Sequence, residues 1–183
     1  NLPVTGAISM DFNLPELSPF LKTKEQLSGE FNIDNSKPWH LFISSFVYSS
    51  LSDSAIDGIE KKIPGYGPFV EIARKSQNQV IEWIKSMALK HSDKVFIYRP
   101  HPNEFGTQIV TELEHSSDNI YVIPNYSIRQ WVAVCETSSN WFSTSIADCF
   151  FARRPCCVLR PIEIPSNFEI KILEGCKFTS SLV

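Results

Sequence analysis

One turn of the sequence carries the residue best suited to chemistry near neutral pH. His101 lies between Pro100 and Pro102 and follows an apolar run at 94–99 that is rich in β-branched and aromatic residues. Such a run is typical of a buried strand, and prolines cannot continue a central strand because they lack an N–H for the ladder. We therefore expect His101 on a stiff turn just past the carboxyl end of a strand. Its imidazole could contact a phosphate or act as acid or base, and a turn histidine that bonds a nearby carbonyl is the alternative.

A second candidate is the run Ser143, Thr144 and Ser145, which follows a predicted strand and begins a predicted helix. Hydroxyls and free N–H groups converge at such a position with the positive end of the helix dipole, and together they can bind an anion. An ordinary helix cap would use the same residues. Because the triplet and His101 are expected at one edge of the same sheet, the sequence favours a phosphate-bearing ligand.

The elements that must position these residues alternate along the chain. An apolar stripe at three- and four-residue steps predicts a helix over 69–91, and shorter helices are expected over 107–115, 128–134 and 143–151. The predicted strands cover 39–46, 94–99, 119–124, 137–142 and 156–160. This alternation predicts the α/β class, a Rossmann-like parallel sheet with helices on both faces.

The carboxyl ends of parallel strands meet at one edge, and ligands of open α/β sheets bind there. Each predicted strand end carries polar groups, so we expect further binding residues among them. They are Ser44, Ser45, Arg99, Asn103, Glu104, Asn125, Tyr126 and Glu163. For Glu104 the sequence leaves three roles open: holding the far nitrogen of the imidazole, accepting from a ribose hydroxyl, or facing solvent.

The remaining segments suggest one domain with a leading piece. Residues 1–30 are expected to be a linker with a short helix near 16–29, and residues 31–183 the domain itself. The polar stretch 47–68 is expected to be a long, functional or mobile loop with one helical turn. The tail from Ser166 has pieces that the pattern does not order. The sequence begins at Asn1 and runs directly into Leu-Pro-Val-Thr-Gly, which suggests that it is part of a longer protein.

Composition narrows the classes of function. The net charge is −3 and no long basic run occurs, so we expect no nucleic-acid partner. The five cysteines form no CxxC pair and are expected to be structural thiols in a reducing cytoplasm. P-loop, GxGxxG and HExxH motifs are absent, and so is any Asp-x-Asp pair that would hold a nucleotide-sugar through a metal. We expect no metal site and no cofactor.

Several stretches resemble bacterial surface-carbohydrate biosynthesis proteins. Their motif TGNPRxDLLRPEL is similar to VTGAISMDFNLPEL at 4–17. Their RPHPxE turn is similar to YRPHPNE at 98–104. FISSF at 42–46 matches a strand that ends in small polar residues. The stretch 127–161 is similar to their Ser/Thr motif, helix and final strand. The histidine-proline turn and the Ser/Thr residues also resemble those of GT-B sialyltransferases and Kdo transferases.

The resemblance implies the C-terminal, donor-binding half of a metal-independent GT-B glycosyltransferase that uses a nucleotide-sugar, with a CMP-sugar favoured. His101 would contact the donor phosphate as the catalytic residue, Ser143, Thr144 and Ser145 would hold the same phosphate, and Glu104 with the 123–126 turn would hold the ribose or base.

The resemblance also implies that an N-terminal domain outside this chain supplies the general base and binds a glycan or glycolipid acceptor. The full-length protein would be cytoplasmic, with peripheral association at the inner face of the membrane as an open expectation. The alternatives are another GT-B-like enzyme, such as a polyol-phosphate transferase or a sugar 2-epimerase, or a non-catalytic Rossmann-like interaction module.

Overall fold

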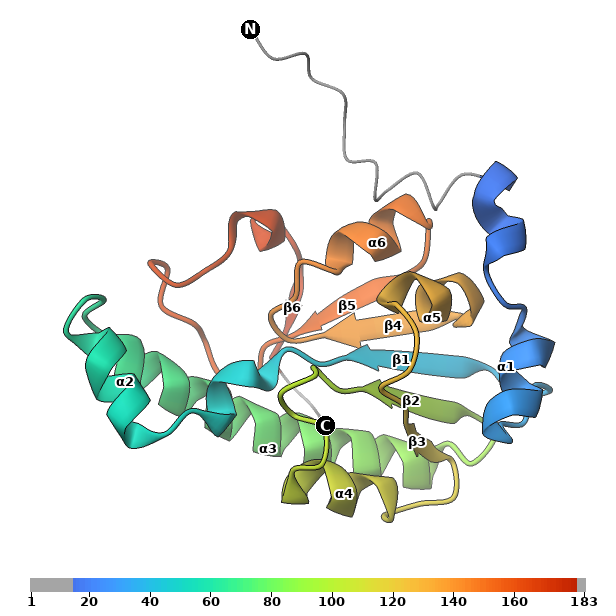
Figure 1. Cartoon of the computed structure of the whole chain (residues 1–183), viewed down its shortest axis with the longest axis horizontal. Coiled ribbons are helices and arrows are strands. Elements are labelled where there is room, and N and C mark those ends of the chain that lie inside the picture. Colours follow the sequence, from blue (N-terminus) through green and yellow to red (C-terminus); the bar gives the residue numbers. More distant parts are fainter. Residues whose placement is uncertain (1–14, 181–183) are drawn as a thin grey trace, which may run out of the picture.

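The computed structural model describes residues 15–180. Most of the motif at 4–17 that resembles the surface-carbohydrate proteins therefore lies outside the described residues. The chain forms a six-stranded sheet with the order β3-β2-β1-β4-β5-β6. Every neighbouring pair is parallel, and the arrowheads all point the same way in Figure 1. The strands are β1 (Trp39–Ile43), β2 (Val95–Arg99), β3 (Ile120–Val122), β4 (Thr137–Asn140), β5 (Cys156–Leu159) and β6 (Phe178–Thr179).

This architecture confirms the predicted fold class, a Rossmann-like α/β domain, and its strand order is that of the Rossmann fold. The five predicted strands are present, each shorter than the apolar run that predicted it. The sixth, β6, comes from the tail that the sequence pattern did not order. It joins the sheet by pairing Val158 with Phe178 and Leu159 with Thr179.

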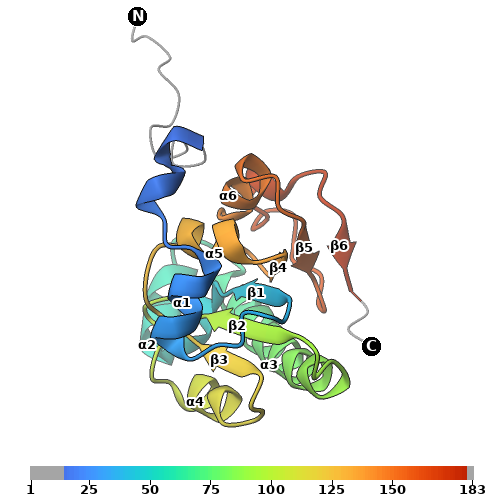
Figure 2. The same ribbon diagram turned by 90° about the vertical axis from the view of Figure 1, so that its right-hand side faces the viewer.

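Helices cover both faces of the sheet. Figures 1 and 2 show α3 (Tyr66–Lys90) and α4 (Gln108–Glu114) on one face, with α5 (Ile128–Val134) and α6 (Ile146–Phe151) on the other. Each face has its own hydrophobic core. Helix α1 (Lys24–Phe31), which follows a short 3₁₀ helix, η2 (Pro15–Phe20), packs on the second face, where Leu27 is fully buried. The predicted short helix therefore contributes to the core of the domain.

The segment between β1 and α3 corrects one prediction. It contains a 3₁₀ helix, η3 (Phe46–Ser50), and the eight-residue helix α2 (Asp53–Glu60), where the sequence predicted a loop with one helical turn. Helix α3 also begins three residues before the predicted start. The Glu60 carboxylate explains this, because it accepts hydrogen bonds from the N–H groups of Gly65 and Gly67, both at 2.7 Å. A carboxylate at this end satisfies free donors of the helix and complements its dipole.

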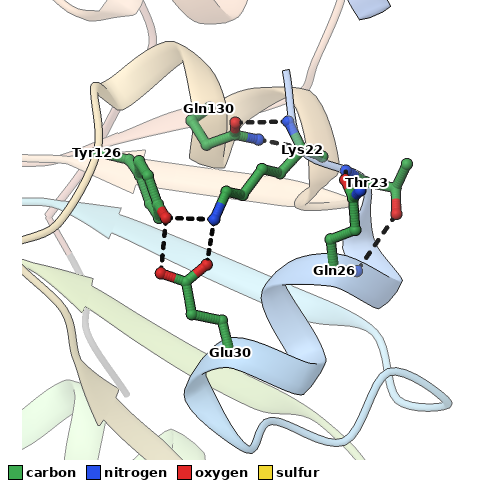
Figure 3. Close-up of polar contacts among 6 residues, drawn as sticks. All are labelled: Lys22, Thr23, Gln26, Glu30, Tyr126 and Gln130. Carbon is green, nitrogen blue, oxygen red and sulfur yellow. Dashed lines mark hydrogen bonds and ion pairs between the residues drawn. The ribbon is translucent and has the colours of Figure 1, made fainter. Parts of the chain in front are cut away.

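A polar cluster joins the segment before α1 to α5 and to the loop that precedes α5 (Figure 3). The Lys22 backbone N–H donates to the Gln130 side chain at 2.8 Å, and the Gln130 amide donates back to the Lys22 carbonyl at 2.9 Å. The Lys22 ammonium contacts both Glu30 and Tyr126, and the Tyr126 hydroxyl donates to Glu30 at 2.6 Å. These contacts join segments about a hundred residues apart in sequence and hold α1 in place. Within residues 15–180, no helix is both long and apolar enough to cross a membrane.

His40 gives the fold a specific sensitivity to acid. It lies on β1 with its ring nitrogens 2.8 Å from the Thr137 hydroxyl and 2.9 Å from the Ser139 hydroxyl, and burial lowers its pKa to about 4. The unfolded chain binds the proton near pH 6.5, so stability is complete above that pH and falls as the pH drops toward 4. We expect His40 to remove about 2 kcal/mol of unfolding free energy between pH 7 and pH 5.

The measurement is urea denaturation across this pH range for the native chain and for His40→Gln. The variant should show a shallower loss of stability with acid. His115→Gln, which changes an exposed histidine at a helix end, is the matched control and should keep the native pH dependence. Equal slopes for the native chain and His40→Gln would contradict the prediction.

Candidate functional site

The site lies at the ends of β1 and β4, two adjacent strands whose following connections pass to opposite faces of the sheet. The chain runs from β1 through α3 on one face, whereas β4 is followed by α6 on the other. Because Ile43 pairs with both Arg99 and Asn140, the three strands end at the same level. The loops that follow them diverge at this level, which is the position where open α/β sheets bind ligands.

A cavity of about 400 Å³ opens at this edge. Seven of the residues predicted from sequence line it, and they come from three different strand ends. They are Ser44, Ser45, Arg99, His101, Ser143, Thr144 and Ser145. The fold therefore brings the histidine turn and the hydroxyl-rich loop to one cavity, as the parallel-sheet argument predicted.

The turn that carries His101 is organised by its own backbone and by Glu104. The Glu104 N–H donates to the His101 carbonyl at 2.8 Å, and Gly106 adopts a φ of +80°, which glycine tolerates without strain. The Asn103 N–H donates to His101 Nδ1 at 3.3 Å. Because Nδ1 accepts this bond, the neutral imidazole carries its proton on Nε2, which is then a donor for a ligand.

Glu104 corrects the roles that the sequence left open. Its side chain is buried, with 1% of the residue exposed, and therefore contacts neither solvent nor a ribose in the cavity. One carboxylate oxygen accepts from the Ser44 hydroxyl at 2.8 Å, and the other accepts from the His101 backbone N–H at 2.7 Å. Gln77 on α3 also donates to the first oxygen, at 3.3 Å. Glu104 holds the turn by its backbone, and the imidazole donates no hydrogen bond to it.

The ionisation of Glu104 reflects opposing effects. Burial raises the pKa of this carboxyl, while hydrogen bonds from the Ser44 hydroxyl and the His101 N–H favour the charged form and lower it. The Ser44 hydroxyl also accepts from the Tyr98 hydroxyl at 2.8 Å. Although Ser44 was predicted to bind a ligand, its hydroxyl is therefore engaged inside the protein.

The loop from Ser143 to Ser145 combines one internal bond with free hydroxyls. The Ser143 hydroxyl accepts from the Ser145 N–H at 3.2 Å, and the Ser143 N–H donates to the Asn140 side chain at 3.3 Å. Thr144 is exposed, and Ser145 forms no side-chain capping bond within the described residues. The helix that follows, α6, has only six residues, so its dipole is smaller than that of the predicted longer helix.

Two further groups face this cavity from β1 and β2. The Ser45 hydroxyl accepts from the Phe142 N–H at 3.1 Å and keeps its own hydrogen for a ligand. The Arg99 guanidinium donates to the carbonyls of Pro100 and Tyr126, both at 2.8 Å, and burial lowers its pKa. Arg99 therefore places a positive charge beside the cavity and connects two of the loops around it.

Five predicted residues do not line the cavity, and one of them is the buried Glu104. Asn103 and Asn125 are exposed on the neighbouring turns. Tyr126 points its hydroxyl toward Lys22 and Glu30 (Figure 3), and only its carbonyl reaches Arg99. Glu163 lines a different cavity, together with Arg160 and its ion-pair partner Glu169. The strand-end argument placed these residues at the correct edge but could not give their direction.

The sequence pattern missed several lining residues. Val47 and Tyr48 belong to η3, Ile128 begins α5, and Ile170 comes from the tail just before the 3₁₀ helix η4 (Lys171–Leu173). The only signal in the sequence was that 47–68 was expected to be a functional loop. Within residues 15–180, no group of three or more His, Cys, Asp or Glu side chains converges as a metal site.

Fold and cavity together define the class of the protein, a Rossmann-like α/β domain with a cavity of mixed polar and apolar lining at its switch point. No protein-family model matches the chain, and no curated protein matches it. Among solved structures, one similar to it is the S. aureus MnaA–UDP co-structure, with 13% identity and a TM-score of 0.48. The similarity covers 73% of this chain and 30% of that chain, so this chain spans less than a third of the length of MnaA.

The bonds of Glu104 lead to a prediction about stability. In Glu104→Gln one acceptor oxygen becomes an NH₂ group, which faces a donor, either the His101 N–H or the Ser44 hydroxyl. We expect a loss of about 1–3 kcal/mol in unfolding free energy, measured as a lower urea midpoint at unchanged slope.

Glu163→Gln is the matched control, because that carboxylate is exposed. It should change stability by less than about 0.5 kcal/mol. A Glu104→Gln variant as stable as the native chain would show that the carboxylate does not hold the turn.

Proposed function

We propose that this chain is the donor-binding half of a GT-B glycosyltransferase and that it binds a nucleotide-sugar, with a CMP-sugar preferred. The observation that carries the proposal is the convergence of the His101 imidazole with the hydroxyls of Ser45, Thr144 and Ser145 around one cavity. The resemblance of the histidine-proline turn and the Ser/Thr loop to sialyltransferases and Kdo transferases supports it.

The charge around the cavity supports a ligand with a single phosphate. Among the described residues that line it, Arg99 is the only one with a permanently charged side chain, and no carboxylate is present. A CMP-sugar carries one phosphodiester charge, whereas UDP- and GDP-sugars carry two. One guanidinium, one imidazole N–H and several hydroxyls match the smaller charge.

The proposed chemistry follows from where charge develops. When the bond between the sugar carbon and the phosphate oxygen breaks, the phosphate of CMP gains a second negative charge. Donors fixed around that phosphate stabilise this charge more strongly than the charge of the bound donor, and they therefore lower the barrier. His101 Nε2–H and the hydroxyls of Thr144 and Ser145 would make these bonds, so the proposed step asks for no metal ion.

The remaining parts of the reaction are assigned to the rest of a longer protein. An N-terminal domain, facing the open side of the cavity, would bind a glycan or glycolipid acceptor and supply the general base. This chain alone is then expected to bind the donor without transferring its sugar. A full-length protein would work in the cytoplasm. If its acceptor is a lipid-linked glycan, it would act at the inner face of the membrane.

Titration calorimetry with CMP, CDP, UDP and GDP tests the proposal. We expect CMP to bind best, and His101→Ala to weaken it about 10- to 100-fold through the loss of a hydrogen bond to a charged phosphate. Thr144→Val should weaken binding in the same direction and by a smaller factor.

His115→Ala is the matched control, because His115 is an exposed histidine at the end of α4 and should leave CMP binding unchanged. Absence of binding by all four nucleotides would refute the proposed function. A preference for UDP would refute the CMP assignment and favour a UDP-sugar enzyme, such as the 2-epimerase alternative.

A further inference from the structure

Two cysteines lie together directly behind the hydroxyl-rich loop. Cys149 on α6 is fully buried, and Cys156 at the start of β5 is half-buried. The Ser138 hydroxyl on β4 lies 3.3 Å from Cys149 Sγ, and the Asn140 amide on the same strand donates to Cys156 Sγ at 3.3 Å. Ser138 pairs directly with Cys156 in the sheet, so the residue whose hydroxyl contacts Cys149 is also the neighbour of Cys156, and the two cysteines lie close together.

The environments of the two sulfurs differ. A hydrogen bond from the Cys149 thiol lowers the pKa of Cys156, and the Ser138 and Asn140 side chains act in the same direction. The same pairing, together with burial, raises the pKa of Cys149. A thiolate is the form of cysteine that attacks electrophiles, so Cys156 has the character of a nucleophile and Cys149 that of its thiol partner.

Asn140 connects this pair to the cavity. The side chain is fully buried and uses both ends, because its NH₂ group donates to Cys156 Sγ while its oxygen accepts from the Ser143 N–H at 3.3 Å. Ser143 in turn accepts from the Ser145 N–H. The sulfur, the amide and the loop form one continuous series of hydrogen bonds.

We propose that Cys149 and Cys156 are an oxidisable thiol pair, which a hydroperoxide converts to an intramolecular disulfide, and that Asn140 transmits this change to the Ser143 loop. The Cys156 thiolate attacks one peroxide oxygen, the O–O bond breaks, and the other oxygen leaves as water after taking a proton. The resulting sulfenic acid is attacked by Cys149 sulfur, the S–O bond breaks, and a second water leaves with the Cys149 proton. Two thiols lose two electrons, and one hydrogen peroxide becomes two waters.

The disulfide changes the sulfur that accepts the hydrogen bond from Asn140. A disulfide sulfur is a weak acceptor, so the bond that holds the Asn140 amide weakens and the Ser143 N–H loses a fixed acceptor. We therefore expect oxidation to loosen the hydroxyl-rich loop. Its effect on nucleotide binding rests on the proposed function, whereas formation of the disulfide does not.

The first experiment treats the chain with a small excess of hydrogen peroxide and follows intact mass and disulfide-linked peptides. We expect the loss of two hydrogen atoms and one peptide pair joining Cys149 to Cys156. Cys149→Ser should stop at a Cys156 sulfenic acid that dimedone traps. Cys135→Ser is the matched control, because burial raises the pKa of Cys135 and the variant should still form the disulfide. Oxidation that occurs first at Cys157 or Cys176, or no disulfide at all, would overturn the proposal.

The second experiment measures CMP affinity for the reduced chain and for the same chain carrying the disulfide. We expect oxidation to weaken CMP about 10-fold, and reduction by dithiothreitol to restore it. Cys156→Ser, which has no thiol at position 156 and cannot form the disulfide, should show the same CMP affinity before and after peroxide treatment. Unchanged affinity after complete disulfide formation would overturn the link through Asn140. Absence of CMP binding by the reduced chain would refute the proposed function while the peptide map still tests the thiol pair.

Discussion

The buried carboxylate of Glu104 is the constraint on which the site depends. Donors from the end of β1, from α3 and from the backbone of the histidine turn all reach its two oxygens. Each donor would be left unsatisfied in the interior if the turn moved, at a cost of about 1–3 kcal/mol each. The direction of His101 is therefore set by a group behind it as well as by the stiffness of its two prolines.

The register of the sheet gives this turn its neighbours. Because Ile43 is level with Arg99 on one side and with Asn140 on the other, the chain leaves three adjacent strands at the same height. The connections then pass to opposite faces, and the cavity lies between them. A shift of one strand by a single residue would turn the polar side chains at its end toward the other face.

Polar residues at this edge form two layers with different tasks. An inner layer, made by Glu104, Ser44 and Asn140, accepts or relays hydrogen bonds from the protein itself. An outer layer, which contains His101 and Thr144, keeps donors directed at the cavity. The inner layer holds the outer one in position, which is how a preorganised site avoids reorganising when charge develops. The thiol pair borders the inner layer, where a change at sulfur is transmitted by hydrogen bonds rather than by contact with a ligand.

The sequence by itself determined the alternation of strands and helices, the long helix near 69–91, and the meeting of His101 with Ser143 at one edge. These features depend on local periodicity and on prolines that cannot remain in a central strand. Only the tertiary structure decided that Glu104 is buried, that Glu163 lines another cavity, and that Ile170 reaches the site. Whether a polar side chain faces a ligand or the interior depends on packing against segments far away in sequence. The residue pattern around a position does not show which distant segments will pack against it.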